Sequence, residues 1–243
     1  MTNTALATEP LRCFAKPPGL TARAGWVDRW QLQFPAGSWH LPARQEQALS
    51  FLVPLLLCGE QSAQQVFHHQ AGQLQLGAQK TLAQALQKIE QEEEAHERAL
   101  QGLAAALCIS PDLHQRKRRA QHFYASLARD VSLGQHFTRI EILDACVCRI
   151  MHALSRASWG ESHPLYYLFD AIKADEARHV GTSRRYGKML GVGNTETERE
   201  RRLIGALIVD FLSPDAAAFE CLGVDPARLF KQLHPGLSEN ATL

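Results

Sequence analysis

The feature that most constrains this chain is a repeated pattern of acids and histidines inside two long helical stretches. Glu93-Glu94-Ala95-His96 and Glu176-Ala177-Arg178-His179 each place a glutamate three residues before a histidine. That spacing puts a carboxylate and an imidazole one turn apart on one helix face, where both can ligate the same metal ion. An acid also precedes each copy by a similar distance, Glu60 by 33 residues and Asp144 by 32. The chain therefore contains two matching halves.

The distance between each acid and its motif predicts two helical hairpins. Two antiparallel helices joined by a short turn bring together residues that are equally distant from the turn. The midpoint of the first half falls at Leu76-Gly77, and the midpoint of the second falls at Gly160. Because glycine favours turns, we expect both hairpins to close there with their acids level.

The candidate ligands lie on the apolar faces of their helices. Apolar residues recur every three or four positions along three stretches. Each series includes one candidate acid, and the second also includes His96. The series are Leu49, Val53, Leu56, Glu60, Ala63 and Phe67; Leu82, Leu86, Ile89, Glu93, His96, Leu100, Leu103 and Leu107; and Phe137, Ile140, Asp144, Val147, Met151 and Leu154. Unpaired buried carboxylates are very costly, so acids converging in a core require cations, and two metal ions would offset their charge.

This arrangement resembles the ferritin-like di-iron or di-manganese carboxylate superfamily. In that superfamily, two helices supply one carboxylate each and two others supply Glu-x-x-His. The resemblance covers about residues 43 to 190. It implies an all-α fold, a ferritin-like four-helix bundle with a long crossover. The ligands it implies are the bridging Glu93 and Glu176, the terminal Glu60 and Asp144, and the imidazoles of His96 and His179.

Glu141 is an alternative to Asp144 as the ligand from the third helix, because glutamate is commoner at that position in the superfamily. Asp144 is preferred since it lies on the apolar stripe and reproduces the spacing of the first half. Glu141 lies about 60° away from it around the helix.

Two further acids directly precede the bridging glutamates. By the resemblance, Asp175 accepts a hydrogen bond from His96, and Glu92 accepts one from His179. Each such bond would join opposite hairpins and orient a ligand. Arg178 makes the second motif more similar to the oxygen-activating oxygenases of the superfamily than to iron-storage ferritins.

The resemblance thus implies a non-haem di-iron oxygenase that uses O2 to hydroxylate, N-oxygenate or desaturate a small organic substrate. An external electron donor and an electron-transfer partner are expected, and a manganese–iron pair or aldehyde deformylation is an open alternative. Small residues near the ligands, such as Ala63 and Ala145, leave room for a substrate.

Two other functions compete with this one. The first is iron oxidation or storage by a ferroxidase or other iron-binding ferritin-like protein, which usually needs a shorter chain. The second is tRNA hydroxylation, because Arg116-Lys117-Arg118-Arg119 could contact RNA and the nearby Phe123 and Tyr124 could stack on a base.

Helices are expected at about 43–71, 78–109, 131–157 and 164–190. Residues 1 to about 41 lack a sustained period and predict an aromatic strap across the bundle. Ser110-Pro111-Asp112 predicts the capped start of a short helix in the crossover, with proline as its first residue. Beyond the bundle, Thr195-Glu196-Thr197-Glu198 predicts a capping box at the start of a helix, and Ser213-Pro214 and Asp225-Pro226 predict two shorter helices. No strand is expected.

The composition is that of one ordinary globular domain spanning residues 1–243. A hydrophobic content of 45% provides for a sizeable core, and a formal charge of +1 argues against a protein that binds polyanions by bulk charge. The longest apolar run, 49–58, is too short to span a membrane. The first residues lack the features of a signal peptide, so we expect a cytoplasmic protein. We also expect a monomer or a homodimer.

The cysteines are expected to be unpaired. Cys58, Cys108, Cys146 and Cys148 fall within the predicted helices, and the sequence shows neither a disulfide framework nor a Cys-x-x-Cys pair. Buried small hydrophobic side chains are their expected role.

Overall fold

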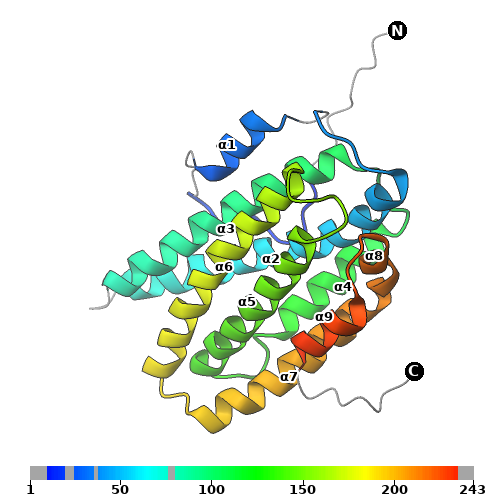
Figure 1. Ribbon diagram of the computed structural model, residues 1–243. Coiled ribbons are helices and arrows are strands. Elements are labelled where there is room, and N and C mark those ends of the chain that lie inside the picture. Colours follow the sequence, from blue (N-terminus) through cyan, green and yellow to red (C-terminus); the bar gives the residue numbers. More distant parts are fainter. Residues whose placement is uncertain (1–9, 20–24, 36–37, 76–79, 235–243) are drawn as a thin grey trace.

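The computed structural model describes residues 10–19, 25–35, 38–75 and 80–234, and every regular element in these ranges is a helix. Four long helices build the core of the fold (Figure 1): α2 (Ala43–Gln75), α3 (Lys80–Ala106), α5 (Leu133–Ser155) and α6 (Pro164–Met189). α2 packs along α3, and α5 packs along α6. The expected all-α fold and both of the expected helix pairs are therefore confirmed.

The ends of these helices lie close to the predicted positions. α3 ends at Ala106, so Cys108 lies beyond the helix and is exposed, in contrast to the prediction. The predicted turn at Leu76-Gly77 falls outside the described residues. In the turn between α5 and α6, Gly160 has a φ of +84°, a left-handed conformation that glycine adopts without strain.

The shorter helices cover the sides of the long ones. α4 (Leu113–Ser126) packs on α2, and α7 (Asn194–Leu212) packs on α5. A 3-10 turn, η1 (Ser213–Asp215), leads into α8 (Ala216–Cys221) against α2, and α9 (Pro226–Leu233) contacts α5 and α7. Asp225 caps α9 as expected, since its carboxylate accepts a hydrogen bond from the Arg228 backbone N–H at 3.2 Å.

Two of the predicted helix starts are wrong. α7 begins at Asn194, one residue before the expected capping box, because Gly193, with its extended backbone, serves as the N-cap in place of Thr195. The Thr197 hydroxyl consequently donates to the Gly193 carbonyl from inside the helix. α4 begins only after Asp112, because Ser110-Pro111-Asp112 forms a turn in which the Leu113 N–H donates to the Ser110 carbonyl.

Two of the four residues in the basic cluster of the crossover are used within the fold. Arg116 and Arg119 both form ion pairs with the buried Asp215 of η1. The rings of Phe123 and Tyr124 are buried between α4 and its neighbours, and Phe123 stacks on Phe211 of α7 with ring centroids 4.3 Å apart.

The N-terminal segment contains a helix, which the sequence did not indicate. α1 (Trp26–Gln33) lies across α3 and α6 (Figure 1), and the Trp30 indole N–H donates to the Pro164 carbonyl at 2.9 Å. Residues before α1 are held on α2 by Gln61, whose amide oxygen accepts hydrogen bonds from the backbone N–H groups of Cys13 and Phe14.

The expectation that the cysteines are unpaired is wrong for Cys58. Cys58 of α2 forms a disulfide with Cys13, and their Cα atoms are 5.3 Å apart, a usual distance for this bond. The pairing has no local sequence signal, because the two residues are 45 positions apart and Cys13 lies in a segment without periodicity. The bond ties the N-terminal segment to α2 two residues before Glu60.

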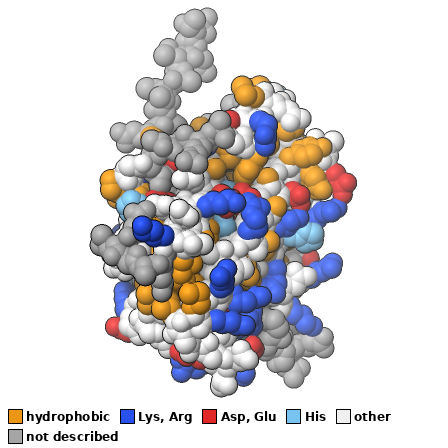
Figure 2. Space-filling model, turned by 90° about the vertical axis from the view of Figure 1, so that its left-hand side faces the viewer, with side chains coloured by type: hydrophobic (Ala, Val, Ile, Leu, Met, Phe, Trp, Pro, Cys, Tyr) orange, Lys and Arg blue, Asp and Glu red, His pale blue; other side chains and the backbone are white. Residues whose placement is uncertain are grey.

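The surface carries both charged and hydrophobic side chains (Figure 2). On the face drawn in Figure 2, Lys and Arg side chains gather near the middle and hydrophobic patches lie beside them. Among the described helices, none combines the length and the apolar character that crossing a membrane requires.

Replacing both Cys13 and Cys58 with serine is expected to lower the free energy of unfolding by about 4 kcal/mol, because the bond restricts a long loop in the unfolded chain. Urea unfolding under oxidising conditions measures this difference. Cys108→Ser is the control, since Cys108 is exposed and unpaired and its replacement should change stability by less than about 0.5 kcal/mol. Equal stability of the double variant and the natural protein would contradict the prediction.

Candidate metal centre

Acidic and histidine side chains from three long helices meet in one buried cluster near the middle of each helix. Glu60 of α2, Glu93 and His96 of α3, and Glu176 of α6 present ligand atoms that all lie within 4.8 Å of one another. None of these residues is more than 5% exposed. Four of the six candidate ligands are thus close enough together to hold a metal ion.

The two glutamates of the Glu-x-x-His motifs lie between the two histidines. Glu93 places Oε2 3.8 Å from Nδ1 of His96 and Oε1 3.0 Å from Nδ1 of His179. Glu176 places Oε1 3.4 Å from Nδ1 of His96 and Oε2 3.6 Å from Nδ1 of His179. Each glutamate therefore offers one oxygen to each histidine, which is the arrangement that carboxylates shared between two cation positions would have.

The remaining candidates lie on the same cluster but outside the four-residue group. Asp144 of α5 is buried, and its Oδ2 atom has no hydrogen-bond partner. Nδ1 of His179 has no hydrogen-bond partner of ideal geometry, although Oε1 of Glu93 lies 3.0 Å from it. Leaving such groups buried and unsatisfied costs about 1–3 kcal/mol each. Cations between these side chains would satisfy both atoms, so the residues present fit a metal centre.

The outer nitrogen of each histidine contacts an acid of the opposite hairpin, as the resemblance implied. Nε2 of His96 lies 3.1 Å from Oδ2 of Asp175, and Nε2 of His179 lies 2.9 Å from Oε2 of Glu92. The neighbouring hydrogen bonds lower the pKa of both acids despite their burial, so these carboxylates accept and the imidazoles donate. The Nδ1 atoms are left facing the inner carboxylates.

Arg178 and Trp26 fix the two outer acids. Arg178 donates from Nη2 to Oε1 of Glu92 at 3.0 Å and also to Oδ1 of Asp175. The indole N–H of Trp26 donates to Oδ2 of Asp175 at 2.9 Å. The sequence reasoning missed Trp26, because nothing in the irregular N-terminal segment indicates which helix it reaches.

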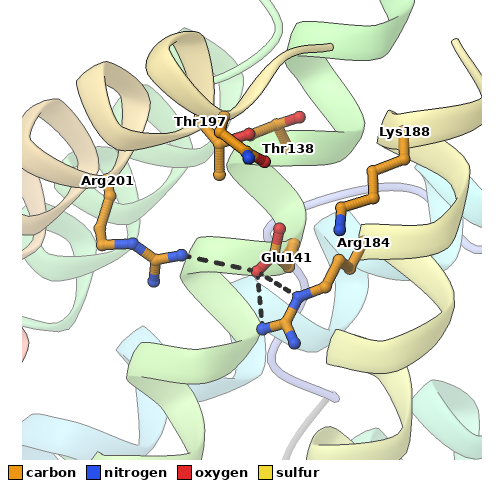
Figure 3. Close-up of a pocket in the computed structure, with 7 residues that line it drawn as sticks. Thr138, Glu141, Arg184, Lys188, Thr197 and Arg201 are labelled. Atoms are coloured by element: carbon orange, nitrogen blue, oxygen red, sulfur yellow. Dashed lines mark hydrogen bonds and ion pairs between the residues drawn. The ribbon is translucent and has the colours of Figure 1, made fainter. Parts of the chain in front are cut away.

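Glu141 faces away from the cluster and is already neutralised. Figure 3 shows its carboxylate directed toward Arg184 of α6 and Arg201 of α7. The Oε1 atom lies 2.9 Å from Nη2 of Arg184 and 3.8 Å from Nη2 of Arg201. These residues line a pocket of about 210 Å³ together with Thr138, Lys188 and Thr197. Of the two candidates on α5, Glu141 pairs with arginines, whereas Asp144 has a buried oxygen without a hydrogen-bond partner.

Arginine and lysine neutralise the acids around the cluster but not those within it. Glu97 of α3 pairs with Arg12 at 2.8 Å, and Glu94 pairs with Lys16. Among the described residues, no Lys or Arg forms an ion pair with Glu60, Glu93, Asp144 or Glu176. Within the described part of the chain, the basic groups in contact with the inner carboxylates are therefore the two histidines.

Burial and mutual repulsion determine which inner groups hold protons. Burial, and then the charges of Glu176 and Glu60, raise the pKa of Glu93 well above its usual value, and burial next to Glu176 does the same for Asp144. Burial also opposes ionisation of Glu176, but the charges and hydrogen bonds of His179 and His96 outweigh it and lower the pKa to about 2.

The two histidines respond in the opposite direction. Burial disfavours their charged forms, but the surrounding carboxylates outweigh it and raise the pKa of both His96 and His179 well above the usual value. In the absence of metal, burial and the neighbouring charges thus favour the protonated forms of Glu93, Asp144 and both histidines.

The choice between the two acids of α5 can be tested directly. Asp144→Asn removes a charged donor, and we expect it to weaken Co²⁺ binding by more than about 100-fold, which exceeds the usual cost of losing an outer partner. Glu141→Gln keeps the shape of a side chain that faces Arg184 and should leave Co²⁺ affinity unchanged. Isothermal titration calorimetry measures both. A larger loss in the Glu141 variant would reverse the assignment.

Metal binding is expected to strengthen as pH rises. Glu93, Asp144, His96 and His179 have raised pKa values, so they hold protons at neutral pH that a bound cation must displace. Adding Co²⁺ to weakly buffered protein should therefore acidify the solution, which a pH indicator records. An affinity that is constant between about pH 6 and pH 8 would show that these groups do not bind the metal.

The geometry of the cluster is the basis for any functional assignment of this chain. Comparisons with protein-family models, curated proteins and solved structures give no match. What the buried acids and histidines can do must accordingly be argued from their own positions and chemistry.

Proposed function

We propose that this protein is a ferritin-like di-iron enzyme that uses O2 to oxidise a small organic molecule. The observation that carries the proposal is the position of Glu93 and Glu176, each of which offers one oxygen to each of two histidines. The residues that would hold the metal pair are Glu60, Glu93, His96, Asp144, Glu176 and His179. Carboxylate and imidazole donors suit iron and also a manganese–iron pair.

The protein's own contribution is orientation and exclusion of water. When bound, two ferrous ions supply the redox chemistry of O2 activation, and an external donor returns the electrons. Asp175 and Glu92 hold the imidazoles with Nδ1 toward the centre, and Arg178 fixes both acids. The apolar residues above and below the ligands on each helix keep the cluster dry, which strengthens every charge interaction in it. Hydroxylation, N-oxygenation and desaturation are all compatible with such a site.

The two competing functions have less support. An RNA-binding role would use the four basic residues 116–119 with Phe123 and Tyr124. Arg116 and Arg119, however, pair with Asp215, and both rings are buried. Iron oxidation and storage would use the same ligand atoms as the oxygenase. Size-exclusion chromatography distinguishes storage from the proposal, because a storage protein forms a large cage and we expect a monomer or homodimer.

Reconstitution with ferrous iron tests the proposal. Under anaerobic conditions the protein is expected to bind about two iron ions per chain and then to consume O2 when exposed to it. His96→Ala should lose most of the iron while keeping its helical circular dichroism signal, because it removes an inner donor. His69→Ala is the matched control, since His69 is exposed on α2 and contacts Gln73. If the natural protein retains no transition metal after reconstitution, the proposal is wrong.

A further inference from the structure

A small cavity lies beside the candidate metal centre, between α2, α4 and α5. Its volume is about 170 Å³, and its lining includes the apolar side chains Phe14, Ala63, Val66, Phe67, Ile140 and Leu143. Phe67 and Ile140 are buried at its inner end, whereas Ala125 and Ala128 of α4 and the following turn are exposed at its outer side. The cavity therefore leads from the surface toward the middle of the long helices.

Asp144 lines the cavity and is also one of the candidate ligands. The residue is 7% exposed, and its buried Oδ2 atom has no hydrogen-bond partner. Ala63 also lines the cavity and lies one turn beyond Glu60 on α2, where its small side chain leaves space next to the acids. A molecule in this cavity would lie directly beside a candidate ligand of the metal centre.

The lining selects for a neutral and mainly apolar molecule. Among the described residues that line the cavity, none is a lysine or an arginine. Burial, and then the charge of Arg139, lower the pKa of His136, so this side chain is uncharged at neutral pH. The Tyr124 hydroxyl already donates to the Leu55 carbonyl at 3.3 Å. The volume is similar to that of an engineered apolar cavity of about 150 Å³ that binds benzene.

The cavity walls are held in place by specific contacts. The backbone N–H of Phe14 donates to Oε1 of Gln61 at 3.2 Å, and the preceding Cys13 is joined to Cys58. On the opposite wall, α4 approaches α2 so closely that a Cβ atom on Gly59 would lie 2.7 Å from the Tyr124 hydroxyl oxygen. Phe14 and Tyr124 therefore form fixed sides, and the space between them is preformed.

We infer that this cavity binds a neutral, mainly apolar molecule the size of a single aromatic ring and holds it beside Asp144. That the bound molecule is the substrate rests on the proposed function, whereas the binding itself does not. The sodium salt of benzoic acid should not bind, because its charge would be buried next to Asp144 without a partner.

Fluorobenzene is the probe for this inference, and its binding is followed by ¹⁹F NMR. Saturable binding is expected for the natural protein. Ala63→Phe fills the cavity, and Ala128→Trp covers its outer side from a surface turn that is remote from the ligands. Each substitution should weaken binding at least about tenfold. The matched control, Ala106→Phe, changes an exposed residue at the end of α3 that does not line the cavity and should bind as the natural protein does.

A second measurement separates this inference from the proposed function. In Co²⁺-loaded protein, fluorobenzene should shift the visible absorption bands of the metal, because Asp144 borders both sites, and Ala63→Phe should abolish the shift. Fluorobenzene binding by a protein that takes up no metal would support the cavity and refute the proposed function. Metal uptake with equal fluorobenzene binding in all three variants and the natural protein would refute the cavity assignment and leave the proposed function standing.

Discussion

The burial of four carboxylates among apolar helices is the constraint on which the rest of this structure depends. An ionised acid in such surroundings is tolerated only beside positive charge. Around the cluster that charge is built into the chain, as in the pairs of Glu94 with Lys16 and Glu141 with Arg184. Inside the cluster, the basic partners that the described residues supply are His96 and His179. The carboxylates of the cluster can therefore be neutralised by protons or by bound metal cations, both of which can be exchanged, rather than by a lysine or arginine from the described part of the chain.

The segments outside the four long helices serve this charge balance. α1 carries Trp26, which donates to Asp175, and the residues before α1 bring Arg12 and Lys16 to the acids of α3. α7 brings Arg201 toward Glu141. These contacts give α1, the residues before it and α7 a role beside the two hairpins. The added elements neutralise or orient acids that lie next to the centre, and they leave the inner carboxylates without permanent cationic partners.

The sequence predicts those parts of the molecule that depend on neighbouring residues along one helix. Glu93 and His96 could be placed on a buried face because Leu86, Ile89 and Leu100 continue the same period. The position of Glu141 off the apolar stripe could be predicted, but its partners Arg184 and Arg201 could not. The pairing of Cys58 with Cys13 could not be predicted either, because the partner comes from a distant segment without periodicity. The start of α7 was misplaced for a local reason, since a glycine with extended backbone can replace a side-chain cap.

Arg178 has a consequence that extends beyond the acid next to it. One guanidinium holds both Asp175 and Glu92, and each of these acids orients a different histidine. A shift of either acid therefore changes the position of the arginine and, through it, the second imidazole. The two halves of the cluster are therefore linked through one side chain. If the proposed metal pair binds there, its two positions would be coupled, and such coupling is reciprocal: the factor by which the first ion changes affinity at the second position equals the factor by which the second changes affinity at the first.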